Sequence, residues 1–319
     1  MLRAPKARDW FSLLILTVLW GSAFLCTELA LNSFPPPVVV AGRILIAAVI
    51  VYSYLRFSGR ALPRNIIDWL PMLVIAVCGN VLPFNLISWS QQHIDSSLAG
   101  VLMAVMPLFV LTLAHFFVPG SRLTRYRAAG FLLGFAGIVV VIGPDFTQGT
   151  DNNMALWGSL AALTAALSYA VSTIFTRRLG DGDPMLRAAG MLIVASVLSL
   201  PAAVIELPAL NTPSSVSLMA LGFLGVMATG FATLLYFRLI QGPGPAFLSL
   251  VNFLVPVWAV LAGAFFLGET LKTSVVAGLG LILSGIAISE FGARAISSVR
   301  SLRARYSTGA SSAVAREEV

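Results

Sequence analysis

Charged residues are scarce in this chain. Only 10% of its 319 residues are charged, whereas 58% are hydrophobic, and the mean hydropathy is +0.92. A soluble protein of this length needs a charged surface that so few residues cannot supply. The composition therefore excludes a soluble globular protein and predicts an integral membrane protein.

Reactive and metal-binding side chains are scarce as well. The two cysteines, Cys26 and Cys78, lie inside apolar runs and lack the spacing of metal ligands, and the two histidines, His93 and His115, fall near opposite helix ends. The sequence contains no GxxxxGK[ST] loop and no DDxxD-like cluster, so ATP-driven transport and prenyl-type chemistry lack their residues. We predict no catalytic residue, no cofactor and no metal, and hence a protein that is not an enzyme.

Apolar runs, by contrast, are abundant. Most of them approach the roughly 20 residues that a membrane-spanning helix needs, and none alternates with the period of a β-barrel strand. The expected fold is therefore an all-α integral membrane protein with ten transmembrane helices, at about 11–31, 36–55, 66–89, 97–118, 128–143, 154–176, 187–206, 215–237, 246–267 and 274–291.

The basic residues predict the orientation in the membrane. Of the 20 Lys and Arg residues, all except Arg43 and Lys272 fall near the N-terminus, in alternate loops or in the C-terminal tail. Because cytoplasmic loops carry the excess of basic residues, both termini are expected in the cytoplasm. The net charge of +7 then reflects topology, and no nucleic-acid partner is predicted.

The two halves of the chain repeat each other. A shift of 149 residues aligns Pro35 with Pro184, Gln92 with Gln241, and Pro107 with Pro256. Each half has five spans, an odd number, so the second half enters the membrane from the opposite side. We predict a cytoplasmic N-terminus at 1–10, a first repeat at 11–143, a periplasmic linker at 144–153, a second repeat at 154–291 and a basic cytoplasmic tail at 292–319.

Several stretches resemble the EamA-domain branch of the drug/metabolite transporter superfamily. They are "LWGSAF" at 19–24, Arg43, "AGVLMAVMPLF" at 99–109 and "LVNFLVPVWAVLAGAFFLGETLKTSVVAGLGLILSGI" at 250–286, and the resemblance covers about 10–291. It implies a secondary, non-ATP transporter in the inner membrane that exports amino acids, related metabolites or drugs by alternating access. One departure is that the "LGE" ending at Glu269 has the acid-free counterpart Val118-Pro119-Gly120 in the first half.

Partners and other functions follow from the same resemblance. A small-molecule substrate and the lipid bilayer are the predicted partners, while proton coupling and a homodimer are left open. The alternatives are a membrane-bound enzyme that acts on lipid-linked substrates, and a channel.

The repeat also predicts a central substrate cavity, because equivalent positions of an inverted repeat lie at similar depth. Aromatic, amide, hydroxyl and thioether side chains then pair across the halves: Trp20 with Tyr169, Phe24 with Thr173, Asn80 with Thr229, Phe84 with Thr233, and Met103 with Asn252. The competing interpretation is that these polar groups only join helices. Pro107 and Pro256 are predicted to kink their helices and free the carbonyls of Met103 and Asn252 for gating or binding.

Glu28 and Arg43 place opposite charges inside the first two spans. Charges at membrane depth usually pair or line a pathway, whereas those near helix ends can reach the headgroups. The preferred interpretation is an intramembrane ion pair. The alternatives are that the two side chains extend separately to the headgroups, or that Glu28 carries a coupling proton.

Overall fold

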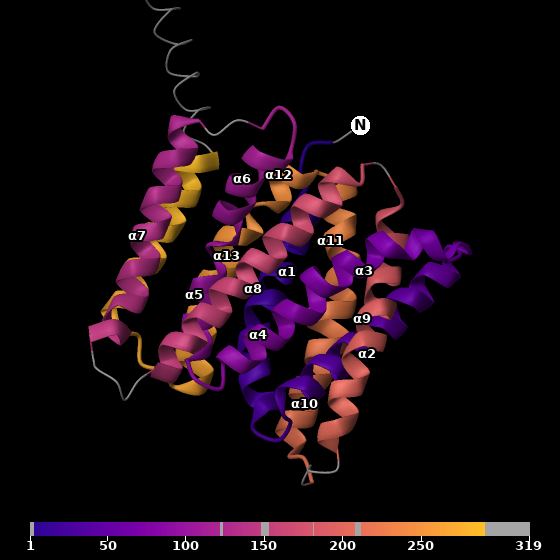
Figure 1. Ribbon diagram of the computed structural model, residues 1–319, viewed down its shortest axis with the longest axis horizontal. Coiled ribbons are helices and arrows are strands. Elements are labelled where there is room, and N and C mark those ends of the chain that lie inside the picture. The colour runs from indigo at the N-terminus through magenta and orange to yellow at the C-terminus, as the bar shows by residue number, and fades with distance from the viewer. Residues whose placement is uncertain (1–2, 122–123, 148–152, 181, 208–211, 291–319) are drawn as a thin grey trace, which may run out of the picture.

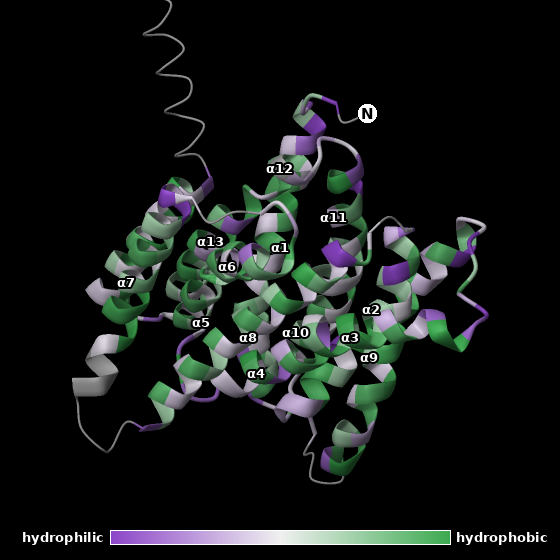
Figure 2. Ribbon diagram, turned by 45° about the horizontal axis from the view of Figure 1, so that its top comes forward, coloured by the Kyte–Doolittle hydropathy of each residue, from purple (hydrophilic) through white to green (hydrophobic). Residues whose placement is uncertain are grey.

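The structure is a computed structural model that describes residues 3–290, except 122–123, 148–152, 181 and 208–211. The predicted tail at 292–319 and residues 148–152 of the predicted linker at 144–153 lie outside the described residues. Every described element is a helix, and hydrophobic residues cover the middle of the bundle while hydrophilic residues gather at its ends (Figure 2).

The first half contains five spanning segments (Figure 1). They are α1 (Ala7–Leu31); α2 (Pro36–Phe57); a third span made of η1 (Ile66–Trp69), α3 (Leu70–Ala76), η2 (Val77–Val81) and α4 (Leu82–Ser90); a fourth made of α5 (Ser96–Met103) and α6 (Met106–Phe117); and α7 (Arg125–Thr147).

The second half repeats this order. Its segments are α8 (Asn153–Arg178); α9 (Pro184–Glu206); an eighth span made of α10 (Ser215–Phe223), η5 (Leu224–Phe231) and α11 (Ala232–Gln241); a ninth made of α12 (Pro245–Leu248) and α13 (Val251–Leu267); and the final helix Thr273–Glu290. Nine of the ten segments have the length and hydropathy to cross a membrane, and the ninth contributes the shorter apolar helix Val251–Leu267. The predicted all-α architecture is confirmed, with boundaries within a few residues of those expected.

Packing between the halves is reciprocal. Helix α2 packs against α9, its counterpart, while α1 packs against α13 just as α8 packs against α5 and α6. The third span contacts α8 and α9, and the eighth span contacts α1 and α2 in the same way. One cross-link is explicit, since Trp258 Nε1 on α13 donates to Ser22 Oγ on α1 at 2.8 Å. Equivalent helices of the two halves therefore make equivalent contacts across the bundle.

The fifth and tenth spans form a separate pair at one side of the bundle (Figure 1). Their backbones approach closely because glycines line the contact: a Cβ added to Gly285 would lie 2.5 Å from the Gly130 carbonyl oxygen, and one added to Gly137 would lie 2.8 Å from that of Gly278. Small residues permit such contact between membrane helices. These glycines therefore serve helix packing.

Both halves contain a wide π-helical segment at the same position. The 149-residue shift places Val77–Val81 on residues 226–230, inside Leu224–Phe231. In the first half Pro83 lacks an N–H, so the Gly79 carbonyl loses its usual partner. The second half has Ala232 at the equivalent position, and no proline explains its π segment. Such segments often mark functional sites, and this pair lies at the predicted cavity.

Candidate functional site

A buried arginine lies where the two halves meet. Arg43 projects from α2, is only 6% exposed, and donates from Nε and Nη2 to Thr229 Oγ1 on η5, at 3.3 and 3.1 Å. Its guanidinium carbon lies 3.8 Å from the centre of the Phe84 ring on α4. A cation over an aromatic face is attracted by the ring quadrupole. Arg43 thus joins helices from both repeats.

The predicted ion pair between Glu28 and Arg43 is not present in this structure. Glu28 instead accepts a long hydrogen bond of 3.5 Å from Gln91 Nε2, which also donates to the Phe24 carbonyl at 2.8 Å. Elsewhere in the described part of the chain, Arg3 forms an ion pair with Asp9 and Arg60 with Asp183. Arg43 turns toward the eighth span while Glu28 faces the end of the third, so the two charges diverge.

Aromatic side chains form contacts between the two halves. The Phe84 ring that lies under Arg43 meets Tyr169 of α8 edge-on, with ring centres 6.3 Å apart. Trp20 of α1 lies 5.7 Å from Tyr236 of α11. Three predicted cavity residues, Phe84, Tyr169 and Thr229, therefore lie around Arg43.

Asn80 supplies an unused hydrogen-bond donor in the same region. It lies on η2, one turn before Phe84, and is only 4% exposed. Its Nδ2 group has no partner among the described residues. Because an unpaired buried donor is costly, a group of this kind calls for an explanation such as a ligand or a water.

The remaining predicted cavity residues are less directly placed. Thr173 and Thr233 donate to the carbonyls of Tyr169 and Thr229 on their own helices, which occupies their hydroxyl protons. Phe24 and Met103 pack against an apolar cluster that includes Leu102, and Asn252 is half-buried near the start of α13. All ten predicted cavity side chains are buried or half-buried.

The two prolines act differently in the two halves. Before Pro107 the fourth span is interrupted at Ala104–Val105, between α5 and α6. Pro256, however, lies inside the continuous α13, and the ninth span is interrupted at Ser249–Leu250. The second interruption falls about one turn earlier in the repeat register, so the prolines do not mark equivalent breaks.

Glu269 makes a contact that the sequence did not predict. Its carboxylate accepts from Ser96 N at 2.9 Å, Ser96 Oγ at 2.6 Å and Ser97 N at 3.0 Å, and so caps the start of α5 from the other half of the chain. A carboxylate at a helix N-terminus is stabilised by the free N–H groups and the helix dipole. We call this contact the Glu269 cap.

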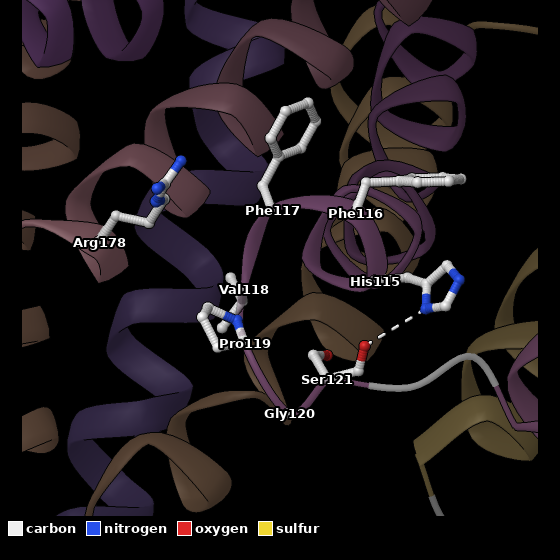
Figure 3. Close-up of a pocket in the computed structure, with 8 residues that line it drawn as sticks. All are labelled: His115, Phe116, Phe117, Val118, Pro119, Gly120, Ser121 and Arg178. Atoms are coloured by element: carbon white, nitrogen blue, oxygen red, sulfur yellow. Dashed lines mark hydrogen bonds between the residues drawn. The ribbon is translucent and has the colours of Figure 1, made fainter.

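The equivalent cap is missing at the other end of the bundle. The repeat register puts Gly120 in place of Glu269, and Pro245-Ala246 in place of Ser96-Ser97. The second copy of the contact therefore lacks both the acid and the serines that the Glu269 cap joins. A shallow pocket of about 460 Å³ lies at Gly120, lined by His115–Ser121 and Arg178 (Figure 3). The paired change is visible in the sequence and could have revealed the contact.

Asp95 precedes α5 and makes no capping bond of its own. The partial burial of its carboxylate and then the Glu269 charge raise the pKa of Asp95, whereas Lys272 opposes them. Glu28 is a further acid in range. An acid whose pKa rises on folding makes the folded state less stable as the pH climbs from the unfolded-state pKa to the higher folded-state pKa, and the loss is complete above the latter.

Asp95→Asn should therefore raise the thermal unfolding midpoint at pH 7–8, and the gain should shrink as the pH falls and vanish below about pH 3, where aspartate is protonated in the folded and in the unfolded state. The control is Asp68→Asn in exposed η1. The measurement is the thermal unfolding midpoint of the purified wild-type protein and both variants across this pH range. A gain in midpoint that is independent of pH would contradict the expectation.

The fold defines a membrane protein of many spans built from two equivalent halves. The model of the EamA-like transporter family matches residues 10–143 and again 156–291. The chain belongs to this family, as the sequence resemblance implied.

Individual relatives share most of their length with this chain. The "uncharacterized inner membrane transporter YedA" of Escherichia coli is 26% identical over 88% of this chain and 90% of its own. A WAT1-related chloroplastic protein of Arabidopsis thaliana is 26% identical over 89% and 69%. An "uncharacterized transporter" of Archaeoglobus fulgidus is 24% identical over 88% and 98%. A crystal structure with a TM-score of 0.66 and 20% identity covers 92% of this chain and 99% of its own, and it shows the fold alone.

Proposed function

We propose that this protein is a secondary transporter of the inner membrane that exports small organic metabolites, such as amino acids, related compounds or drugs, by alternating access. The observation that carries the proposal is the Arg43 centre, a buried group of charged, aromatic and amide side chains contributed by both repeats. In a repeated carrier the solute site lies between the halves, which rock around it.

Orientation and location are part of the same proposal. The basic residues support cytoplasmic termini, and the name of the Escherichia coli relative supports the inner membrane. A reporter that is active only in the cytoplasm, fused after residue 290, tests the orientation. Activity of a periplasmic reporter at that position would refute it.

Counterflow in proteoliposomes tests the carrier function. Vesicles loaded with an unlabelled amino acid should take up its labelled form transiently above equilibrium, and the initial rate should saturate with concentration. A carrier shows counterflow because its binding site returns across the membrane with unlabelled solute bound and then carries labelled solute inward. A channel has no such alternating site, so it only lets the solute gradient dissipate. Across a panel of amino acids and drugs, uptake no greater than in protein-free vesicles would refute the proposal.

Coupling can be read from the same vesicles. An imposed pH gradient should drive accumulation if a proton accompanies the solute, with Glu28 as the proposed carrier, and Glu28→Gln should then remove the response while leaving counterflow intact. Indifference of the wild-type protein to the gradient would refute proton coupling.

A further inference from the structure

We propose that Arg43 binds the carboxylate of an organic monocarboxylate, and that this group defines the class of substrate. The proposal rests on the transport function proposed above and names the chemistry of its substrate. It is carried by the partners of Arg43, by the unused donor of Asn80 and by the aromatic side chains around them.

The charge of Arg43 calls for an anion. Among the described Lys and Arg residues, Arg43 alone is buried, and no carboxylate within the described residues pairs with it. Its partners are a hydroxyl and an aromatic ring, neither of which carries the opposite charge. Because an uncompensated buried charge is strongly destabilising, the site favours a ligand that neutralises it.

The neighbouring polar groups match the acceptor atoms of a carboxylate. Asn80 Nδ2 is a buried donor without a partner, and the Thr229 hydroxyl, which accepts from Arg43, still has a proton to donate. Asn80 and Thr229 occupy equivalent positions in the two π segments. An acceptor-only group with two oxygens can receive from all of these donors, and arginine binds such a group in two-pronged geometry.

The single charge of Arg43 and the aromatic side chains near it narrow the class of substrate further. One cation balances one negative charge, so a phosphate dianion would leave an excess charge in a buried site. Phe84, which lies under the guanidinium, and Tyr169, which meets Phe84 edge-on, offer apolar faces to the rest of the molecule. Pockets with mostly apolar walls and a few polar groups suit small organic ligands. An organic acid with an apolar body fits better than an inorganic anion.

Matched acids and amides test this assignment. The probes are sodium benzoate, phenylacetate and isovalerate, each compared with its amide, together with sodium phosphate and sodium chloride at equal ionic strength. At a concentration about ten times its Kd, a bound acid favours folding about tenfold, which raises the thermal unfolding midpoint. We expect at least one acid to raise the midpoint of the wild-type protein, and its amide and the inorganic salts to have no such effect.

Three variants show whether Arg43 is the binding group. Arg43→Met should abolish the acid-dependent shift, Arg43→Lys should retain part of it because the charge remains, and the exposed Arg56→Met on the same helix should retain all of it. Because removing an unpaired buried charge does not by itself unfold a protein, Arg43→Met should fold. The absence of a shift with every acid, equal shifts with amides, or a shift that persists in Arg43→Met would each overturn the proposal.

Counterflow separates this inference from the transport function. Arg43-dependent binding of acids without any exchange would overturn the carrier and leave the acid site standing. Saturable exchange of amides as fast as acids would leave the carrier standing and overturn the acid site.

Discussion

Gly285→Ala should lower the thermal unfolding midpoint by several degrees, whereas Gly280→Ala, five residues away on the same helix, should leave it unchanged or raise it. A Cβ at Gly285 would lie 2.5 Å from the Gly130 carbonyl oxygen and 2.8 Å from the Gly134 nitrogen. Both are backbone atoms, so the helix Thr273–Glu290 must move away from α7. Overpacking of this kind costs about 1–3 kcal/mol.

Gly280 is a matched control because a Cβ there meets no atom within 4 Å. Alanine also favours a helix over glycine by about 1 kcal/mol, a gain that both variants share and that makes Gly280→Ala neutral or stabilising. Thermal unfolding of the purified proteins in detergent compares them directly. Equal midpoints would show that the fifth and tenth spans do not depend on this close contact.

The second large effect is expected at the Glu269 cap. Glu269→Ala removes three hydrogen bonds to a carboxylate and leaves two N–H groups of α5 without their partner. Loss of a cap costs about 0.5–2 kcal/mol, and hydrogen bonds to charged groups lie at the upper end or above. We expect a loss of about 2 kcal/mol of unfolding free energy, and Ser96→Ala should lose less because the two N–H bonds remain.

A double-mutant cycle isolates the contact. If Glu269 and Ser96 interact, the double variant should lose less than the sum of the single losses, since the Ser96 hydroxyl bond can be lost only once. Glu290→Ala, which removes an exposed carboxylate from the final helix, serves as a control and should have little effect. Strict additivity of Glu269 and Ser96, or an equal loss in Glu290→Ala, would contradict the assignment.

Most of the fold could be predicted because it depends on patterns that the sequence shows directly. Span lengths follow from hydropathy, and the 149-residue register follows from prolines and glutamines that recur at one spacing. The same register located Thr229, Phe84 and Tyr169, which the structure brings around Arg43. Arg43 itself was identified by its charge in an apolar run.

The partners of the charged residues could not be predicted in the same way. Hydropathy fixes the depth of Arg43 and Glu28 but not the rotation of their helices, and a small rotation decides whether they meet. The structure turns Arg43 to Thr229 and Glu28 to Gln91. Depth alone therefore suggested a pair that the packing does not form.

The Glu269 contact was missed for another reason. It joins residues 173 positions apart, and no local pattern announces such a contact. Its only sign is that two changes occur together at equivalent places, Gly120 for the acid and Pro245 for the serine. The π segments are even harder to predict from the sequence, because only one of them is followed by a proline.

The one-sided Glu269 cap has a consequence for the proposed transport cycle. If the two halves were perfectly equivalent, the inward-open and the outward-open conformation would have the same free energy. Without solute, the two conformations would then be equally populated. A cap at one end alone removes that equality, and every 1.4 kcal/mol of difference changes the ratio of the two populations tenfold. The empty carrier would then rest closed at the Glu269 end and accept its cargo from the side that bears Gly120, the cytoplasm in the proposed orientation, where an exporter must load.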